Sequence, residues 1–511
     1  MTLTTENKTK DKTGTPDNQG QGEKRRELMP WLKLRNIPVL KLIAAPETSE
    51  IMAANEAGLS VGEWAPFEDR GTVLGRDKKL SPARLAVPGA PTTTRQAEIL
   101  NTAKIAAPTG IDGVTLGRDV LSQTVVAKDP FTDYNAVPRR ASSPNVCFVG
   151  DVGAGKSSAC KCGYVLRPVI LRNRRAVVFD KKNEQGEGEY AQISRFFGND
   201  PIRYALDGSG VRMNLLDPEI SGTNDDGLNN QLAFLNTVPA LLREGHGADE
   251  WERKALRLAY REVMRTFEGA RTPTTADLHA RLGVISRGEH SLFDMSDEAL
   301  ERLHEAGVSM RWVFDELLDH YGAIFDGETS NGVQLNGKVT TFDVSQLPET
   351  GPVIPMVMGL SNLWLLGRVR RDKGMRTNVI IEEAGHILGG PMATQQRSNI
   401  KLSRGLGISN IYCFHKETDV PAGSPGMAVI EEAQTVNIFR LERPKAAEWA
   451  VSTFGLNAGS AEDIMRLANG HYMLKGSGSV PEFEVEHVRS DWEIQMTNTD
   501  SAMAETATVV G

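Results

Sequence analysis

The chain has 511 residues, of which 40% are hydrophobic and 49 are glycine, so it is long enough for about three domains and can bury a sizeable core. Its 66 acidic residues outnumber its 58 basic ones, and the net charge of −8 excludes a protein coated with positive charge for nucleic acid, so any DNA contact must be local. Four cysteines in so long a chain exclude a disulfide scaffold and fit a reducing cytoplasm.

The beginning of the chain is predicted to lie outside the main domain. Residues 1–28 are rich in Thr, Lys, Asn, Asp and Gly and lack the apolar run of a secretory signal. They are expected to be disordered, because they have too little apolar surface to offset the entropy of ordering. Residues 29–140, which prolines interrupt, are expected to form a small N-terminal region. Its segment Trp31–Arg35 is interpreted as a short strand, or else as a contact to a membrane or a partner.

From about residue 144, short apolar segments alternate with longer helical ones, which predicts an α/β fold with a mostly parallel sheet. The expected strands are Val146–Val149, Ala176–Asp180, Val339–Asp343, Asn378–Glu382, Ile408–Phe414 and Thr435–Phe439. This core is expected to cover 141–224 and 331–490. Between its two parts, 225–330 has apolar residues near helical spacing and is expected to be an inserted helical subdomain. The polar tail 491–511 is expected to be disordered.

The longest uncharged segment, Thr350–Gly367, has eighteen residues and is marginal as a membrane span. It contains Pro352, Pro355 and Gly359, so a buried core helix is the favoured interpretation.

The strongest functional signal is Gly150–Ser157, which matches the P-loop pattern GxxxxGK[ST] and directly follows an apolar strand; we call this segment the P-loop. Its glycines let the backbone curl so that N–H groups point at phosphate oxygens, and the next helix adds its positive end. Lys156 is predicted to reach the β and γ phosphates, and Ser157 to ligate Mg²⁺. The residues expected to bind the nucleotide are Gly150, Asp151, Val152, Gly153, Ala154, Gly155, Lys156, Ser157 and Ser158. ATP is preferred to GTP, because no Asn-Lys-x-Asp guanine signature is visible.

A second acidic site follows the apolar run Asn378–Ile381, which ends in Glu382 and Glu383. A P-loop enzyme needs carboxylates at a strand end to hold the metal and to polarise water. We assign Glu382 to the water shell of Mg²⁺ and Glu383 to the attacking water. The alternative is a solvated Glu pair at the start of a helix, where the helix dipole favours it.

The pair Cys160 and Cys162 is close in sequence but is not expected to bind a metal. Side chains two residues apart on a helix point about 200° away from each other, and no His or Cys partner follows at a suitable spacing. Core packing is the favoured interpretation.

Two further segments resemble those of a known family. Val177–Asp180 followed by Lys182 and Glu184 is similar to the hydrophobic-Asp-Pro-Lys-Gly-Glu segment of the HerA, FtsK and VirB-type ATPases. Met213–Pro218 is similar to their Asn-Pro-Leu-Asp-like segment.

The chain most resembles the conjugation, or type IV secretion-like, ATPases of Gram-positive actinobacterial mobile elements. In that group a run like Arg95–Glu98, and then Asp129–Phe131 with Tyr134, precedes the P-loop. The resemblance covers about residues 95 to 480. It implies a RecA-like P-loop ATPase that uses ATP and Mg²⁺.

The resemblance also implies partners and a location. It implies a homo-oligomeric ring, expected to be a hexamer, that powers conjugative transfer of DNA or of its protein machinery. The location would be cytoplasmic, with peripheral contact to a membrane secretion or conjugation complex, and DNA is a candidate partner. The alternatives are a double-stranded DNA translocase of the FtsK or HerA kind and a slow ATP-dependent assembly switch.

Two site residues come from the resemblance alone. Arg404 occupies the place of an arginine that reaches the γ-phosphate of the neighbouring subunit, and His415 occupies the place of a Gln sensor. The alternatives are a helix C-terminal cation for Arg404 and a hydrogen-bonded strand-end histidine for His415. The chain departs from the family at His415 itself, at Glu382 in place of Asp, and at Lys181 and Asn183 in place of Pro and Gly.

Two loops that enter strands are basic, and both are expected on the sheet edge opposite the P-loop. Their residues are Arg172, Arg174, Arg175, Arg368, Arg370, Arg371, Lys373 and Arg376. This edge is either a solvated basic face or a contact for nucleic acid or an acidic partner.

Overall fold

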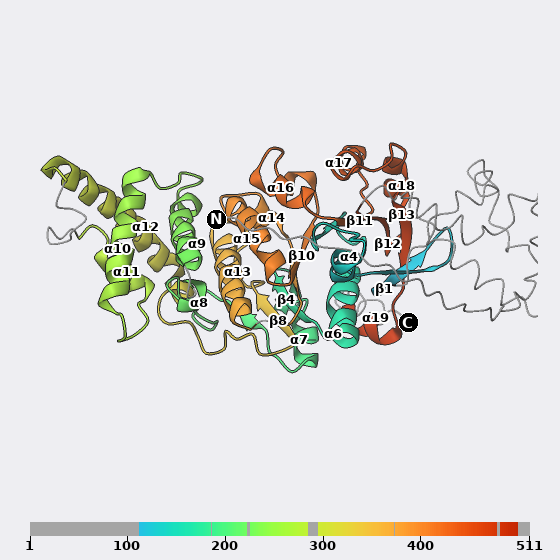
Figure 1. Ribbon diagram of the computed structural model, residues 1–511, viewed down its shortest axis with the longest axis horizontal. Coiled ribbons are helices and arrows are strands. Elements are labelled where there is room, and N and C mark those ends of the chain that lie inside the picture. The colour runs from blue at the N-terminus through green and yellow to red at the C-terminus, as the bar shows by residue number, and fades with distance from the viewer. Residues whose placement is uncertain are drawn as a thin grey trace, which may run out of the picture. The chain divides into compact units, whose positions relative to one another are not determined.

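A computed structural model of the chain describes residues 112–184, 186–221, 225–284, 295–372, 374–477 and 481–498. Within these residues, eleven strands form one sheet in the order β2-β1-β13-β12-β11-β3-β10-β9-β4-β8-β7 (Figure 1). The predictions for 1–28, for the part of 29–140 before residue 112 and for Trp31–Arg35 lie outside the described residues, as does Arg95–Glu98.

The half of the sheet from β11 to β7 is parallel throughout. Its strands are β3 (Val146–Val149), β4 (Arg175–Asp180), β7 (Ile202–Arg203), β8 (Val339–Asp343), β9 (Thr377–Ile381), β10 (Ile408–Phe414) and β11 (Thr435–Phe439). All six predicted strands are present, with differences of one residue at the ends of β4 and β9. The predicted α/β fold with a mostly parallel sheet is therefore confirmed.

The other half of the sheet is antiparallel and was not predicted. Its strands are β1 (Val114–Asp119), β2 (Val125–Lys128), β12 (His471–Lys475) and β13 (Phe483–His487). The prediction that the small N-terminal region extends to residue 140 is wrong for its last part, because β1 pairs with β13 inside the main sheet, with Gly117 opposite His487. The physical reason is that β1 buries Val114 and Leu116 against the core.

Helices cover both faces of the sheet (Figure 1). Alternate strand residues belong to different cores, as in β3, where Val146 and Phe148 face one layer and Cys147 and Val149 the other. The first layer contains α5 (Lys156–Cys160), a π-helix (Lys161–Leu166), α6 (Arg167–Arg172), α7 (Ala191–Phe196) and α19 (Asp491–Thr497). The second contains α13 (Val353–Arg371), α14 (Gly385–Leu388), α15 (Ala393–Gly405), α16 (Pro425–Glu431), α17 (Pro444–Phe454) and α18 (Ser460–Arg466). The remaining short elements are α4 (Pro130–Asn135), β5 (Asn183–Glu184), β6 (Glu187–Gly188) and a 3-10 turn (Glu417–Asp419).

Helix α19 corrects the prediction that 491–511 is a disordered tail. Ser490 and Glu493 form a capping box at its start, and the Glu493 carboxylate accepts a 2.6 Å hydrogen bond from Arg167 Nε. These capping and ionic contacts explain why a polar segment is helical here. Residues 499–511 lie outside the described part of the chain.

Helix α13 contains most of the uncharged segment Thr350–Gly367, and residues 353–367 are buried. The segment is the buried core helix that the sequence favours. Among the described helices, none has the length and hydropathy needed to cross a bilayer.

Between β7 and β8, the described residues form five helices: α8 (Pro218–Ser221), α9 (Asp225–Leu242), α10 (Glu250–Thr266), α11 (Thr275–Arg281) and α12 (Asp297–Phe325). α10 begins with a capping box in which Asp249 and Glu252 satisfy each other's backbone N–H groups. Leu256 and Met310 from α10 and α12 are completely buried, and α9 packs against α8 and α13. Helices α9 to α12 lie within the range 225–330 in which a helical insertion is expected, and α8 lies just before it. That these helices form a domain of their own stays a prediction.

Candidate nucleotide-binding site

The loop from Gly150 to Gly155 connects the carboxyl end of β3 to α5, and its shape requires glycine. Gly150, Gly153 and Gly155 have φ values of 152°, 80° and 101°, a region that side chains with a Cβ rarely adopt. A Cβ at Gly150 would also lie 2.6 Å from Phe439 Cβ. The loop is therefore a curled backbone in front of a helix N-terminus, the arrangement that binds phosphate groups.

Two segments from late in the sequence, one just after β11 and one just before β12, support this loop. Asp151 N donates to Arg440 O (2.9 Å), and the Asp151 carboxylate accepts from Glu442 N (2.7 Å). Gly470 N donates to Ala154 O at 3.1 Å. The P-loop conformation therefore depends on the chain after β11 and before β12 as well as on its own glycines.

Lys156 is folded back over the loop. Its Nζ donates to Gly150 O (2.5 Å) and Asp151 O (2.7 Å) and lies 3.0 Å from His415 Nδ1. Burial lowers the pKa of Lys156 to about 8, although the carboxylate of Glu382 favours its charge. The positive charge of a buried ammonium is stabilised less by neutral backbone carbonyls than by the negatively charged oxygens of a polyphosphate. The residues present therefore suit the nucleotide that the motif predicts.

The side chains of the two carboxylates after β9 diverge. Glu382 is partly buried and its carboxylate lies beside Cys160 of α5, where Oε1 accepts from Tyr190 OH at 2.6 Å, and desolvation raises its pKa. Glu383 has a φ of 52°, and its half-exposed carboxylate lies 3.4 Å from His386 Nε2, whose hydrogen bond lowers the pKa of Glu383. Glu382 is thus coupled to Lys156, whereas Glu383 stays ionised at the rim beside α14.

His415 links the P-loop to these carboxylates. It follows β10, which lies between β3 and β9 in the sheet. Because an ammonium can only donate, Nδ1 of His415 must accept from Lys156, which requires a neutral ring. Burial, and then the nearby charge of Lys156, lowers the pKa of His415 in agreement with this. The structure therefore brings Lys156, His415, Glu382 and Glu383 to one edge of the sheet.

Arg404 is not at this edge. It lies in the last turn of α15, which leads into β10, so it is on the side of the sheet where the strands begin. Its guanidinium lies 3.0 Å from Glu432 Oε2. Arg404 therefore does not reach the P-loop of its own chain.

The sequence reasoning missed a buried network beneath the site. Lys161 Nζ lies 3.0 Å from Glu189 Oε2, with both side chains 1% exposed, and Lys182 also pairs with Glu189. Tyr190 N donates to Asp180 Oδ2 (2.7 Å), and its hydroxyl holds Glu382. Glu189 and Tyr190, just before α7, belong to no motif, so only their place next to the Val177–Asp180 segment could have drawn attention to them.

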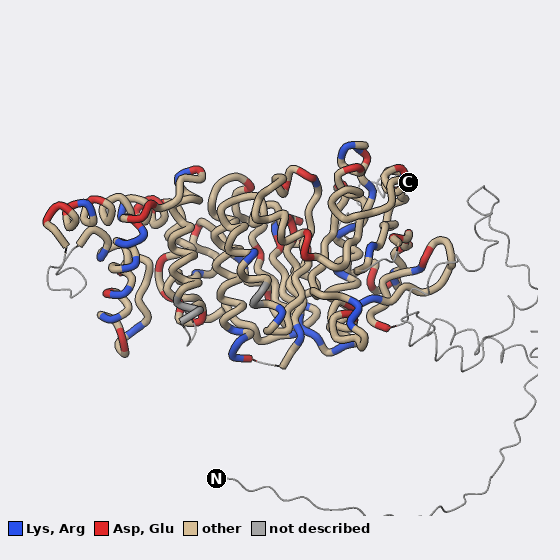
Figure 2. Tube along the Cα trace, turned by 45° about the horizontal axis from the view of Figure 1, so that its top comes forward, with Lys and Arg blue, Asp and Glu red and all other residues tan. Residues whose placement is uncertain are grey.

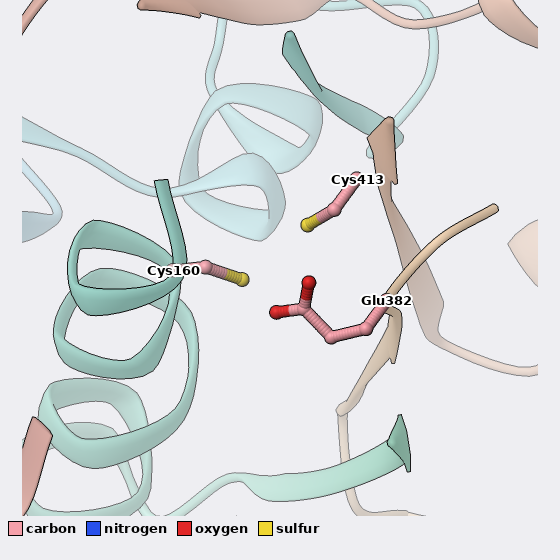
Figure 3. Close-up of side chains that lie close together, drawn as sticks. All are labelled: Cys160, Glu382 and Cys413. Carbon is pink, nitrogen blue, oxygen red and sulfur yellow. The ribbon is translucent and has the colours of Figure 1, made fainter. Parts of the chain in front are cut away.

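Cys160 and Cys162 have different neighbours in the structure. Cys160 and Cys162 diverge, as expected, and Cys162 packs near α19. Cys160 instead faces Cys413 of β10 and the Glu382 carboxylate (Figure 3). A pairing across such a distance in the sequence leaves no local signal.

The two basic loops lie side by side, since Arg175 N donates to Arg376 O at 3.1 Å, and Figure 2 shows several Lys and Arg positions along the lower rim of its view. Some of these arginines have partners within the chain. Arg174 makes two hydrogen bonds of 2.6 and 2.5 Å to Asp129, and Arg371 makes one of 2.7 Å to Glu219. Part of this basic edge is therefore structural, and the predicted Lys373 lies outside the described residues.

Comparisons with known proteins identify the fold. No protein-family model and no curated protein matches the chain. The solved structure of VirB4 of Thermoanaerobacter pseudethanolicus is similar, with a TM-score of 0.60 and 18% identity over 76% of this chain and 99% of that one. The plasmid coupling protein TrwB in complex with an ATP analogue gives 0.48 and 17%, over 68% and 86% of the two chains. The genome-packaging NTPase B204 of Sulfolobus turreted icosahedral virus 2 gives 0.31 and 12%, over 68% and 98%.

Two of these TM-scores lie below 0.5, so the fold is assigned from VirB4. VirB4 is matched over almost its whole length, and the match covers 76% of this chain. The chain therefore has the fold of VirB4, and its resemblance to the HerA, FtsK and VirB-type P-loop ATPases is confirmed at the level of the fold.

Proposed function

We propose that this chain is a Mg²⁺-dependent ATPase motor that powers conjugative, type IV secretion-like transfer of DNA or of its machinery. The observation that carries the proposal is the contact of Lys156 with His415, which joins the P-loop to the strand next to Glu382 and Glu383. The fold that holds these residues is shared with almost the whole of VirB4. We place the motor in the cytoplasm, at the periphery of a membrane complex.

In this proposal bound ATP and Mg²⁺ supply the reacting phosphoryl group and neutralise its charge. The loop N–H groups of Gly150–Ser157 hold the phosphates, and Lys156 leaves the loop carbonyls to donate to them. The Ser157 hydroxyl would hold the metal, and Glu382 would bind its water shell. Glu383, which stays ionised, orients the attacking water and accepts its proton. His415 gives up its hydrogen bond from Lys156 when the lysine turns, so it reports the state of the phosphate site to β10.

Three variants test the roles of these residues. Lys156→Ala should abolish hydrolysis, and Glu383→Gln should stop turnover while ATP still binds, because an amide cannot act as a base. Glu431→Gln, on the exposed side of α16, is the matched control and should be active. Binding is measured with a fluorescent ATP analogue and turnover by phosphate release. If Glu382→Gln blocks turnover and Glu383→Gln does not, the two roles are reversed.

The oligomer is the second part of the proposal. Arg404 lies away from its own P-loop, so it can act on a γ-phosphate only from a neighbouring subunit of a ring, which we propose is a hexamer. Specific activity should then rise steeply with protein concentration. Mixing Arg404→Ala with Lys156→Ala protomers should restore some activity, because some interfaces join an intact loop to an intact arginine.

Glu432→Gln is the control for Arg404, because it breaks the same intrachain ion pair and keeps the arginine. If Arg404 acts between subunits, Glu432→Gln should keep most of the activity that Arg404→Ala loses. Equal losses in both variants, or no rescue in rings shown to be mixed, would assign Arg404 to the intrachain pair with Glu432 instead.

DNA is the proposed charged partner, and the basic edge is its proposed contact. Replacing Arg370, Arg371 and Lys373 with Gln should reduce the slope of log affinity against log salt concentration by about 0.9 for each DNA phosphate that the edge no longer neutralises. Basal ATPase should stay near that of the wild type. Double-stranded DNA that stimulates turnover strongly would favour a translocase of the FtsK or HerA kind. Slow turnover that neither DNA nor assembly raises would favour an assembly switch.

A further inference from the structure

A cluster of three potential metal ligands lies beneath the P-loop, and the proposed hydrolysis uses only one of them. The cluster consists of Cys160, Cys413 and Glu382, and one ligand atom from each lies within 4.8 Å of the other two. Figure 3 shows the two sulfur atoms and the carboxylate directed at a common point. Both cysteines are buried and form no disulfide.

Three rigid elements hold these side chains. Cys160 ends α5, one turn after the lysine of the P-loop. Cys413 lies in β10 and faces the α5 layer, because its neighbours Tyr412 and Phe414 face the opposite core. Glu382 directly follows β9, the next strand of the sheet. The ligands are therefore preorganised by the packing of α5 on two adjacent parallel strands.

A further side chain orients the carboxylate. Tyr190 is completely buried, and its hydroxyl donates a 2.6 Å hydrogen bond to Glu382 Oε1. A hydrogen bond to one oxygen of a ligating carboxylate fixes its direction, as outer partners do in known metal sites. The cluster thus has both its ligands and the support that holds one of them.

We propose that Cys160, Cys413 and Glu382 form a binding site for Zn²⁺. Thiolates select Zn²⁺ over Mg²⁺, which prefers oxygen ligands, and three protein ligands with one open position are a common Zn²⁺ arrangement. A Zn–S distance of about 2.3 Å places tetrahedral ligands roughly 3.8 Å apart, so a small inward movement closes the site.

The charges balance at this site. On binding, the two thiols release their protons to solvent, and two thiolates with one carboxylate then hold Zn²⁺ with a net charge of −1. Lys156 is electrostatically coupled to both Cys413 and Glu382, so it faces this remaining charge. The site therefore needs no further ligand from the protein to be charge-compensated.

Zinc binding has a consequence that rests on the proposed function. While Glu382 ligates Zn²⁺ it cannot serve the water shell of Mg²⁺ at the nucleotide. Zn²⁺ should therefore inhibit ATP turnover in the presence of excess Mg²⁺.

The test uses the full chain, kept reduced with a phosphine and freed of metal. Zn²⁺ is titrated in millimolar Mg²⁺ against a chromophoric chelator, and Co²⁺ is used as a spectroscopic probe. We expect one Zn²⁺ per chain and thiolate-to-Co²⁺ charge-transfer bands. Cys160→Ser and Cys413→Ser should each weaken Zn²⁺ binding at least about tenfold and remove roughly half of the charge-transfer intensity. The other two buried cysteines provide matched controls, and Cys147→Ser and Cys162→Ser should bind as the wild type does.

Two further variants keep the test valid if a serine variant does not fold. Glu382→Gln should weaken Zn²⁺ binding with both thiolate bands retained, and Tyr190→Phe should weaken it by about tenfold with all three ligands present. Unchanged Zn²⁺ affinity in the Cys160 and Cys413 variants, or an equal loss in the Cys147 and Cys162 controls, would overturn the site. A Cys160–Cys413 disulfide that persists in the reductant would also overturn it. Zn²⁺ that binds as predicted without inhibiting turnover would support the site and contradict the role of Glu382 in hydrolysis.

Discussion

Replacing Lys156 with methionine should stabilise the nucleotide-free protein at neutral pH. Burial lowers the pKa of Lys156 from 10.5 to about 8, and each pKa unit corresponds to about 1.36 kcal/mol, so keeping this charge in the folded state costs about 3 kcal/mol. The variant lacks the hydrogen bonds to Gly150 O and Asp151 O, which offsets about 1–2 kcal/mol. We expect a net gain of about 1–2 kcal/mol in the free energy of unfolding at pH 7.

The pH dependence gives this prediction its sign. Between pH 8 and 10.5 the unfolded chain keeps the lysine proton that the folded chain has released, so this lysine makes the stability of the wild type rise with pH in this window. Below pH 8 the destabilisation is fully present. The advantage of Lys156→Met should therefore be largest at pH 7, shrink as pH rises above 8, and disappear before pH 10.5, where the lost hydrogen bonds outweigh the remaining cost of the charge. Other titrating groups are common to both proteins and cancel in the difference.

Urea unfolding followed by tryptophan fluorescence at pH 7, 8, 9 and 10 measures this difference. The same measurement is repeated with Mg-ATP. At a hundredfold excess over Kd, Mg-ATP should raise the free energy of unfolding of the wild type by about 2.7 kcal/mol and leave that of the variant unchanged. A stability difference that stays constant from pH 7 to 10, or a wild type more stable than the variant at pH 7 without ATP, would refute the reasoning. Stabilisation of the variant by Mg-ATP would contradict the role of Lys156 in phosphate binding.

Three further changes probe the scaffold of the site. Glu189→Gln removes the ion-pair partner of the buried Lys161 and should lower the free energy of unfolding by about 3–5 kcal/mol. The control Arg195→Gln breaks an exposed ion pair and should cost less than about 1 kcal/mol; equal losses in urea unfolding would contradict this. Gly155→Ala brings a Cβ to 3.1 Å from Gly470 Cα at a φ of 101° and should abolish binding of a fluorescent ATP analogue; normal affinity would show that the loop tolerates the change. Asp129→Asn weakens the buried pair with Arg174 and should cost on the order of 3 kcal/mol, which a melting temperature equal to that of the wild type would exclude.

The parallel half of the sheet could be predicted because its strands are buried on both faces. Such strands are short apolar runs between turns, so the bounds of β3, β8, β10 and β11 agree with those expected. Strands β1 and β13 have an exposed or half-exposed side and mixed composition, and β7 is only two residues long. These strands depend on their neighbours in the sheet, which one sequence does not reveal.

The residues of the site also divide into those that the sequence predicts and those that it does not. Lys156, Ser157 and the two carboxylates belong to local patterns whose chemistry can be read along a short segment. Tyr190 and Cys413 reach the site only because β4, β9 and β10 are neighbours and α5 packs on them. The direction in which Glu382 and Glu383 diverge depends on the φ of 52° at Glu383, which no residue type there would predict.

The pairing of β1 with β13 has a consequence for synthesis on the ribosome. Arg118 and Glu486 face each other across this pair with a sequence separation of 368, so β1 can pair only after β13 has been made. The P-loop has been translated long before then, but Gly470, which donates to Ala154 O, comes immediately before β12. A nascent chain that ends before this point has the whole phosphate-binding motif without the support that shapes it. Nucleotide affinity should therefore appear late in synthesis, only after the chain has been made as far as Gly470 and β12.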